Sequence, residues 1–397
     1  MFREQNILLK ENKIKKKSNN NILSKIRGKK EYKNKRMVKI LKEVNKNRFL
    51  SKNNILMITI LIFLFIISIL VISKLKFRKN NRNNRNNIQF SLSSEKTHDI
   101  RIAYSLNNDY AYPVIVAITS VLYNSSPENF FTFYLLLTPD VEEENIKKIS
   151  GLKEKYTKCN FVFLRVGNQF NNYFKGYYHS PVVYFRLELS NLINDTNKII
   201  YLDVDTIVHK DLFEFYNLDM GPYYYMGFPG HDLTDFEFNG TRNFINSGCM
   251  LVNLQKLREI NAPALYQEFY NKYGTKKYDE YLINGLFYNK ISFLPLIYGI
   301  PDLGFTNPST ENPEKFWSGF KNFTNFTVND MEYASKNRAI THNCYEMKKW
   351  WQYDYEKLTD IGKQWLFYAS KSHIFDEICQ KYNQFQQQCE KLKTENK

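Results

Sequence analysis

Short apolar runs alternate with helical patterns along the chain from Asp99 onward. Four runs have the length and composition of buried strands, and they lie at residues 100–106, 131–137, 160–166 and 198–208. The stretches between them repeat their apolar positions at helical spacing, in the residues after Pro113, at 141–156 and at 184–193. Strands that alternate with helices predict an α/β fold, a doubly wound and mostly parallel sheet flanked by helices.

Polar side chains follow the predicted strands at their carboxyl ends, where ligands bind in such sheets. Asn107 to Asp109 follow the first strand, Asp140 follows the second, and the fourth reads "IIYLDVDTIV", with Asp203 and Asp205 one residue apart. Side chains two apart on an extended chain share one face, so two like charges meet there. Their burial is costly unless a basic side chain or a cation neutralises them.

A divalent cation such as Mn²⁺ or Mg²⁺ accepts carboxylate oxygens and can bridge a diphosphate. The aspartate pair therefore makes a metal and a diphosphate candidate ligands. The sequence contains no GxGxxG and no GxxxxGK[ST], so a nicotinamide site and a P-loop have no support.

The longest apolar segment, residues 55–73, has nineteen residues without a charge, a glycine or a proline. As a helix it would span roughly 28 Å, close to the hydrocarbon thickness of a bilayer. A buried core helix is the alternative, but a surface helix would show a polar stripe, which this segment lacks. It is too long and too far from Met1 for a cleaved signal peptide. We predict a single transmembrane anchor.

The net charge of +16 points first to nucleic acid or an anionic membrane as a partner. The charge is concentrated beside the apolar segment, because residues 1–54 hold eighteen lysines and arginines against four glutamates, and six more basic residues lie between Lys74 and Arg85. Residues 86–397 carry 32 basic and 36 acidic side chains. Nothing in the chain resembles a base-reading module, so no nucleic-acid partner is predicted.

The flanking charges and the glycosylation sequons favour a type II orientation. Lysine and arginine favour the cytoplasmic side of a membrane, and all five sequons follow the span, at Asn124, Asn194, Asn239, Asn322 and Asn325. We expect a lumenal body in the Golgi or another secretory compartment. The predicted parts are a basic tail (1–54), the anchor (55–73), a polar stem (74–98), a catalytic domain (99–352) and a helical C-terminal extension (353–397).

All five cysteines follow the anchor, and an odd number in an oxidising lumen allows at most two disulfides and one free thiol. Cys379 and Cys389 are the expected pair. No CxxC is present, which argues against a structural zinc site.

Six segments in order resemble the retaining glycosyltransferases of family 8, the group of glycogenin and the bacterial lipopolysaccharide galactosyltransferases. They are "YSLNNDY", "VVYFRLELSNLI", "IIYLDVDTIV", "FINSGCMLVNL", "YDEYLINGLF" and "ITHNCYEMKKWW", over roughly residues 100–352. The resemblance implies a GT-A fold, a UDP-sugar donor, a Mn²⁺ ion or another divalent cation, and retention at the anomeric carbon.

The resemblance also assigns roles to individual residues. Asp203, Asp205 and His342 match the metal ligands, and imidazole suits Mn²⁺ better than Mg²⁺. Lys348 matches the basic residue that holds the departing diphosphate, and Lys349 beside it could substitute. The positions that match donor contacts are Asn107, Asp109, Tyr110 (stacking on uracil), Arg186, Asp203, Val204, Asn246, Ser247 and Lys348, with Gly248 letting the backbone come close.

Asp279 and Glu280 match the mechanistic stretch. Asp279 falls where the family binds sugar hydroxyls, and Glu280 falls beside the anomeric carbon, where several members have glutamine. A carboxylate there could act as a nucleophile or stabilise an oxocarbenium-like centre. Same-face substitution, in which a diphosphate oxygen helps to deprotonate the acceptor, is the alternative. Both acids also suit the first turn of a helix without any chemistry.

The chain departs from the family pattern at several donor contacts. Asn107 stands where aspartate is common, Tyr281 replaces an acid, Tyr345 replaces a glycine, and "KKW" replaces "KPW". These departures suggest a divergent donor or acceptor preference. The sequence thus predicts transfer of a hexose or pentose from a UDP-sugar to a glycan or glycoprotein. The alternatives are a catalytically inactive, membrane-anchored sugar-binding or scaffold protein, and a metal-dependent nucleotide-sugar hydrolase.

Overall fold

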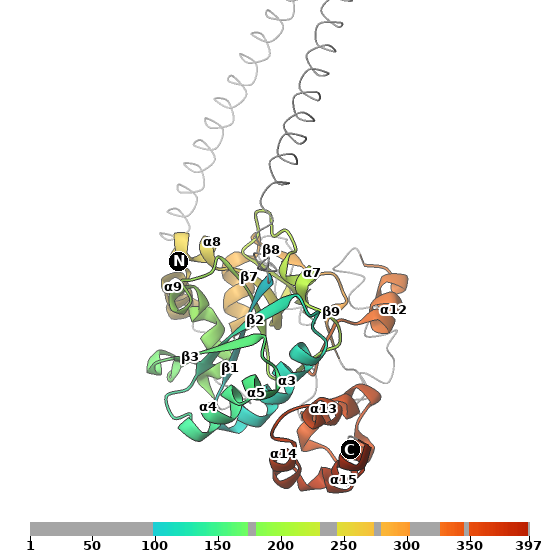
Figure 1. Ribbon diagram of the computed structural model, residues 1–397. Helices are drawn as coiled ribbons and strands as arrows, with labels where there is room; N and C mark the ends of the chain where they lie inside the picture. Colours follow the sequence, from blue (N-terminus) through green and yellow to red (C-terminus); the bar gives the residue numbers. More distant parts are fainter. Residues whose placement is uncertain are drawn as a thin grey trace, which may run out of the picture. The chain divides into compact units, whose positions relative to one another are not determined.

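A seven-stranded sheet runs through the part of the chain that the computed structural model describes (Figure 1). The described residues are 98–173, 180–230, 244–273, 279–301, 326–344 and 349–395, within a unit that spans Ser94–Lys397. None of their helices is both long and apolar enough to cross a bilayer. The predicted anchor at 55–73, the basic tail and all of the stem but its last residue lie outside the described residues.

The strand order of the large sheet is β3-β2-β1-β4-β7-β6-β8. The first four strands and the β6–β8 pair are parallel, whereas β7 is antiparallel to both of its neighbours. The sheet is therefore mixed. Its strands are β1 (His98–Leu106), β2 (Asn129–Leu137), β3 (Cys159–Arg165), β4 (Lys198–Leu202), β6 (Tyr225–Pro229), β7 (Ile245–Asn253) and β8 (Ile291–Phe293).

A second, three-stranded sheet has the order β5-β10-β9. Its strands are β5 (Thr206–Val208), β9 (Tyr298–Pro301) and β10 (Ile340–His342). The apolar run at 198–208 forms two strands in two sheets, and the residues from Asp203 to Asp205, which were expected at the end of the first strand, join them. The Asp203 amide donates to the Gly248 carbonyl at 2.8 Å, and the Asn343 amide donates to the Asp205 carbonyl at 3.0 Å, so both ends of the link are anchored.

Helices cover the sheets and fill the C-terminal region. The 3₁₀ helices are η1 (Asn108–Tyr110), η2 (Asn168–Phe170), η4 (Pro181–Glu188), η5 (Trp350–Gln352), η6 (Tyr355–Lys357) and η7 (Asn383–Phe385). The α-helices are α3 (Ala111–Tyr123), α4 (Glu143–Ser150), α5 (Leu152–Lys155), α6 (Leu189–Leu192), α7 (Phe213–Tyr216), α8 (Leu254–Glu259), α9 (Ala262–Tyr273), α10 (Asp279–Phe287), α12 (Val328–Asn337), α13 (Asp360–Ser370), α14 (Phe375–Lys381) and α15 (Gln386–Glu395). The predicted helix at 141–156 is divided at Gly151 into α4 and α5.

The central strands are apolar on both faces, which explains their nearly continuous apolar sequence. In β2, Phe133 and Leu135 belong to one core cluster, which also contains α3 and the C-terminal helices. Tyr134 and Leu136, which point the other way, belong to a second cluster with α9 and α10. This alternation with a period of two places one hydrophobic layer on each side of the sheet.

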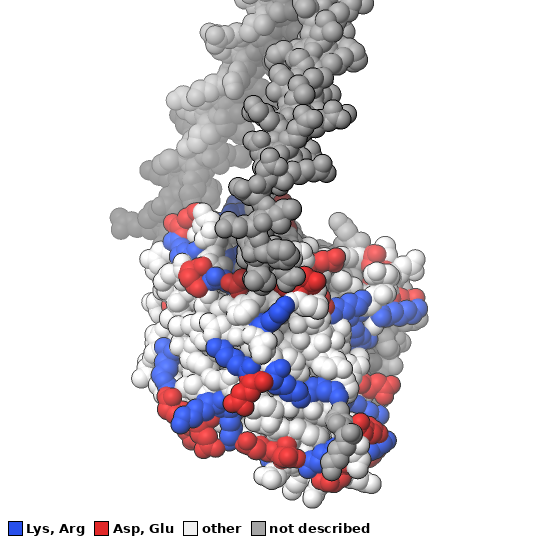
Figure 2. Space-filling model, in the orientation of Figure 1, with Lys and Arg blue, Asp and Glu red and all other residues white. Residues whose placement is uncertain are grey.

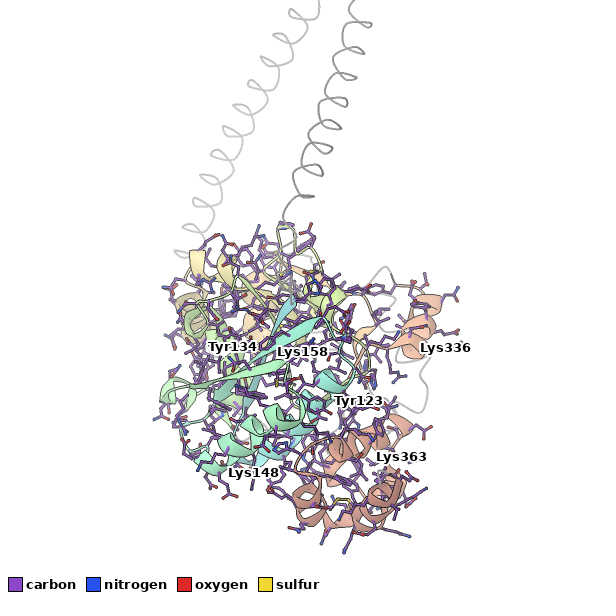
Figure 3. All side chains as sticks on the ribbon, viewed as in Figure 1. Tyr123, Tyr134, Lys148, Lys158, Lys336 and Lys363 are labelled. Carbon is purple, nitrogen blue, oxygen red and sulfur yellow. A yellow bond between two sulfur atoms is a disulfide. The ribbon has the colours of Figure 1, made fainter. Side chains whose placement is uncertain are left out.

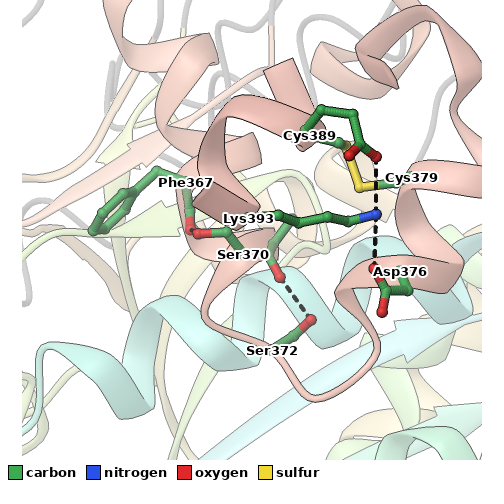
Figure 4. The surroundings of a disulfide bond; sticks show 9 residues. Phe367, Ser370, Ser372, Asp376, Cys379, Cys389 and Lys393 are labelled. Carbon is green, nitrogen blue, oxygen red and sulfur yellow. Dashed lines mark hydrogen bonds and ion pairs between the residues drawn. A yellow bond between two sulfur atoms is a disulfide. The ribbon is translucent and has the colours of Figure 1, made fainter. Parts of the chain in front are cut away.

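The C-terminal helices pack into the first of these clusters. The indole of Trp365 in α13 lies 5.7 Å from that of Trp351 in η5, and Tyr123 at the end of α3 meets Phe367 and Tyr368 of α13 edge to face (Figure 3). A disulfide joins Cys379 in α14 to Cys389 in α15, as the sequence predicted (Figure 4). Lys393 of α15 pairs with Asp376 of α14 at 2.9 Å beside it.

The face of the described unit shown in Figure 2 carries acidic and basic side chains interspersed. Many of the basic groups are paired, as Lys148 is with Glu144 and Glu377 and Arg165 is with Glu143. A surface of mixed sign does not attract a polyanion strongly. This face therefore lacks the basic stripe expected of a nucleic-acid-binding surface.

Candidate functional site

A cavity of about 340 Å³ opens where the two sheets meet. Its lining combines acidic, basic and aromatic side chains with a glycine, a combination suited to a charged ligand that has a flat apolar part. The lining residues are Ser105, Tyr110, Ser180, Val182, Val183, Arg186, Asp203, Val204, Asp205, Asn246, Ser247, Gly248, Asp279, Glu280, His342, Cys344 and Lys349.

Asp203 is held at one of its carboxylate oxygens. Its Oδ1 accepts hydrogen bonds from Arg186 Nη2 at 2.8 Å and from the Tyr201 hydroxyl at 3.1 Å. Its Oδ2 lies on the side of His342, 3.7 Å from Nε2. One oxygen of this carboxylate is therefore fixed by the protein, and the other faces the imidazole.

Asp205 is more deeply buried and has two positive neighbours. Lys349 Nζ lies 2.6 Å from its Oδ2, and His342 Nε2 lies 3.2 Å from its Oδ1. Although burial opposes the ionised form, the charges of Lys349 and His342 lower the pKa of Asp205. The structure thus pairs each aspartate with a basic side chain, Arg186 for Asp203 and Lys349 for Asp205.

The same residues also fit a divalent cation. One ligand atom from each of Asp203, Asp205 and His342 lies within 4.8 Å of the other two. Two carboxylates and an imidazole form a donor set that suits Mn²⁺ and related ions. Gly248 leaves room for this arrangement, since a Cβ there would lie 2.1 Å from His342 Cε1 and 2.6 Å from Asp203 Oδ2.

Arg186 organises the floor of the cavity from η4. In addition to Asp203, it donates from Nη1 to the Ser247 carbonyl at 2.5 Å and to Ser247 Oγ at 2.9 Å. Its Nε lies 3.1 Å from Asp279 Oδ2, and its guanidinium lies over the Tyr201 ring. A single buried cation therefore pairs with two carboxylates, one in the link after β4 and one in α10.

Glu280 lies in the first turn of α10 and points one oxygen at β7. Its Oε1 accepts from Asn246 Nδ2 at 2.7 Å and from the Ser247 amide at 3.0 Å. Burial raises the pKa of Glu280 to about 7, the Asp279 carboxylate adds to the shift, and the Ser247 amide partly opposes it. This carboxyl group is poised between its two protonation states near neutral pH.

Two side-chain contacts fix the start of α10 against β7. Asp279 Oδ2 accepts from Ser247 Oγ at 2.6 Å. Asn284, one turn later, accepts from the Ile245 amide and donates to the Ile245 carbonyl at 2.8 and 2.9 Å. Burial raises the pKa of Asp279, although the positive charge of Arg186 opposes the shift. These contacts set the position from which Glu280 reaches the cavity.

Most of the predicted site residues meet in this cavity, but not all of them. Tyr110 lines it and meets Trp351 edge to face, with ring centroids 6.1 Å apart. Asn107 and Asp109 do not line it, and Asp109 is exposed. Lys348, the predicted diphosphate ligand, lies outside the described residues, whereas its neighbour Lys349 reaches into the cavity. The roles of these residues stay predictions.

Several residues in or beside the cavity were not singled out from the sequence. Tyr201 does not line the cavity but holds Asp203 from two residues earlier, near the end of β4, a spacing that could have revealed it. Ser105 Oγ lies on the neighbouring strand β1, 3.1 Å from the Tyr201 hydroxyl oxygen, and can donate to it because the single Tyr201 hydroxyl hydrogen goes to Asp203. Cys344, Ser180, Val182 and Val183 also line the cavity. Val182, Val183 and Cys344 lie within two of the segments that resemble the family, but no role was assigned to them.

Comparison with known proteins identifies relatives for most of the described chain. A family model described as "Glycosyl transferase family 8" matches residues 101–354. A Haemophilus influenzae protein named "Putative glycosyltransferase" is 30% identical over 206 residues, which cover 49% of this chain and 61% of that protein.

Two solved structures share the fold at low identity. One is the galactosyltransferase LgtC in complex with donor and acceptor sugar analogs, with a TM-score of 0.56 and 19% sequence identity. The alignment covers 69% of this chain and 96% of the LgtC chain. The apo structure of the bifunctional glycosyltransferase WbbM has a TM-score of 0.57 and 18% identity, with coverages of 74% and 53%. This likeness confirms the predicted fold, a mixed α/β sheet of the GT-A type with flanking helices. The family model matches more than half of this chain, which therefore belongs to glycosyl transferase family 8.

Proposed function

We propose that this protein is a metal-dependent retaining glycosyltransferase that moves a hexose or pentose from a UDP-sugar to a glycan or glycoprotein acceptor. Membership of the family supports the reaction class. The observation that carries the proposal is the cluster of Asp203, Asp205 and His342 at the wall of a single polar cavity. A diphosphate bound to a metal at these residues would also contact the basic side chain of Lys349.

Asp203, Asp205 and His342 would hold the divalent cation, with Mn²⁺ as the first candidate because one ligand is an imidazole. When bound, such an ion neutralises the charge that develops on a departing diphosphate. Asp203 would offer Oδ2, since Arg186 and Tyr201 hold its Oδ1. Gly248 keeps the space between this oxygen and His342 open.

The remaining cavity residues would bind and orient the donor. Tyr110 offers a ring, held by Trp351, on which a uracil base could stack. Lys349 adds a positive charge on the side of Asp205. Ser247 and Asn246 lie between the aspartates and α10, where the sugar would be placed.

Glu280 is the proposed residue at the anomeric carbon. Asn246 and Ser247 fix its Oε1, so its orientation is set before the donor binds. Its carboxylate could attack the anomeric carbon or stabilise positive charge on the sugar ring. In same-face substitution Glu280 would supply only the electrostatic stabilisation. A raised pKa near 7 would limit either role at acidic pH, because the protonated group carries no charge.

The test is UDP release by the purified full chain with Mn²⁺ and a panel of UDP- and GDP-sugars. We expect release from one donor, reduced at least about 100-fold by chelator and by Asp203→Asn or Asp205→Asn, because each removes a metal ligand. Asp360→Asn removes a carboxylate whose side chain is 96% exposed, and should leave the rate unchanged. The anomeric configuration of the product reports retention.

The other outcomes identify the alternatives. If no nucleotide sugar in the panel is cleaved, and UDP causes no Mn²⁺-dependent shift in melting temperature, the proposal is contradicted. That result would favour an inactive sugar-binding or scaffold protein. Release of free sugar at the same rate with and without any acceptor would favour a nucleotide-sugar hydrolase.

We further propose a type II membrane location in the Golgi or another secretory compartment, with the catalytic domain in the lumen. This rests on the apolar segment 55–73 and its basic flanks. Of the sequons in described residues, Asn194 is exposed. The side-chain Nδ2 of Asn124 instead lies 2.9 Å from the Ser120 carbonyl, the Val208 carbonyl and the Tyr368 hydroxyl, so this side chain has partners within the protein.

Expression in cells that glycosylate asparagine tests this location. We expect the protein to migrate more slowly on a gel until an endoglycosidase removes its glycans, and Asn194→Gln to carry one glycan fewer than the wild type. We also expect the catalytic domain to be protected from protease in sealed vesicles. A catalytic domain that carries no glycan and is digested in sealed vesicles would contradict the lumenal placement.

A further inference from the structure

The two aspartates differ in how firmly their basic partners are held. Arg186 pairs with Asp203 and is held in place by Ser247 and Asp279 as well. Its side chain is 5% exposed, and moving it would leave two carboxylates without their counter-ion. Arg186 is therefore a permanent part of the site.

Lys349 has weaker attachments. Its Nζ lies 2.6 Å from Asp205 Oδ2 and donates to the Asn343 carbonyl at 2.8 Å. Its side chain is 14% exposed and reaches Asp205 through a flexible four-carbon stem. Its backbone is fixed, since the Lys349 amide donates to Gln352 Oε1 at 2.7 Å and the next residue, Trp350, is fully buried. The ammonium group can therefore move while the main chain stays in place.

The ammonium group also competes with a metal for the negative charge of Asp205. Lys349 engages Oδ2 of Asp205, and the His342 imidazole lies against Oδ1, so both oxygens of this ligand already have a partner. A divalent cation at Asp205 would repel an ammonium at the same carboxylate, and this repulsion is strong in a buried site. A metal at Oδ1, on the side of His342, would therefore weaken the attraction of Asp205 for Lys349 and favour its departure.

We propose that Lys349 is a displaceable counter-ion that makes metal binding depend on the nucleotide. In the metal-free protein it neutralises Asp205, and on metal binding it turns to the diphosphate in the same cavity. This inference rests on the proposed function. Without a nucleotide, the released ammonium would have no anionic partner and the metal would bind weakly. With a nucleoside diphosphate present, the ammonium has a new partner, so each ligand strengthens the binding of the other.

The cavity offers the ammonium a short path. Lys349 and Tyr110 both line it. A nucleotide whose base lies on Tyr110 and whose diphosphate lies near Asp205 would pass beside Lys349. The lysine can thus exchange one anion for another without leaving the site.

The test is a calorimetric titration of Mn²⁺ into the metal-free full chain, with and without saturating UDP. In the wild type we expect UDP to tighten Mn²⁺ binding at least about tenfold. In Lys349→Met, which removes the charge at similar length, Mn²⁺ alone should bind about tenfold more tightly, and the effect of UDP should shrink. Lys349→Gln, which keeps a polar group for Asn343, provides a second variant if the first does not fold.

Lys357→Met is the matched control. Lys357 also lies 2.6 Å from an aspartate, Asp354, but both side chains are exposed and neither lines the cavity. Its Mn²⁺ affinity and the effect of UDP should equal those of the wild type. Equal Mn²⁺ affinity in wild type and Lys349→Met would overturn this inference alone. No Mn²⁺ binding in either protein, with or without UDP, would overturn the proposed metal site and the inference with it.

Discussion

Gly248→Ala is expected to abolish Mn²⁺-dependent turnover while the protein still folds. The added Cβ would lie 2.1 Å from His342 Cε1, 2.8 Å from His342 Nε2 and 2.6 Å from Asp203 Oδ2. His342 is almost fully buried and has no room to yield, so the methyl group must push two proposed ligands apart. We expect Mn²⁺ affinity to fall about 10- to 100-fold, measured by calorimetry beside the UDP-release assay.

Gly221→Ala is the control for adding a methyl group to a glycine. Nothing lies within 4 Å of a Cβ at Gly221, although its φ of +45° makes any side chain there strained. This variant should lose a little stability and keep its Mn²⁺ affinity. If Gly248→Ala bound Mn²⁺ as the wild type does, the metal would not lie between Asp203 and His342.

Arg186→Met is expected to produce the largest loss of stability among single substitutions at the cavity. It leaves Asp203 and Asp279 without their shared cation and removes both donors to Ser247. Removing one partner of a buried ion pair costs about 3–5 kcal/mol, because the remaining charge stays buried. Urea denaturation of the metal-free protein measures the free energy of unfolding.

Arg165→Met removes a cation of a more exposed pair. Arg165 lies 2.7 Å from Glu143, and their side chains are 40% and 74% exposed. Such pairs contribute about 1 kcal/mol or less, so this variant should unfold close to the wild type. A loss at Arg186 as small as that at Arg165 would mean that Asp203 and Asp279 do not depend on the guanidinium for their charge balance.

The parts of the fold that could be predicted are those set by local pattern. The runs at 131–137 and 160–166 are short, apolar and rich in aromatic and branched residues, and they form β2 and β3. Asp203 and Asp205 were expected at the end of a strand, where they lie. The change of sheet between them depends on backbone bonds to Gly248 and Asn343, residues far along the chain, so no local pattern announced it.

Within the site, residue type was predictable but side-chain partnership was not. The acids, His342 and a basic residue near the end of the matched segment were expected to meet. That Lys349 reaches Asp205 depends on how the fold places its backbone beside the buried Trp350, which composition does not encode. The multiple bonds of Arg186 likewise join η4, β4, β7 and α10, whose proximity is a result of the whole fold.

The packing of the C-terminal helices decides where a recombinant fragment can end. The family match stops at residue 354, yet the hydrophobic core continues through Trp365, Phe385 and the disulfide at Cys389. A fragment cut at the family boundary would lose Trp365 and so expose Trp351, the ring that supports Tyr110. Helices outside the matched segment thus support the cavity wall at Tyr110, so substitutions in them could change the shape of the cavity without altering any residue that lines it.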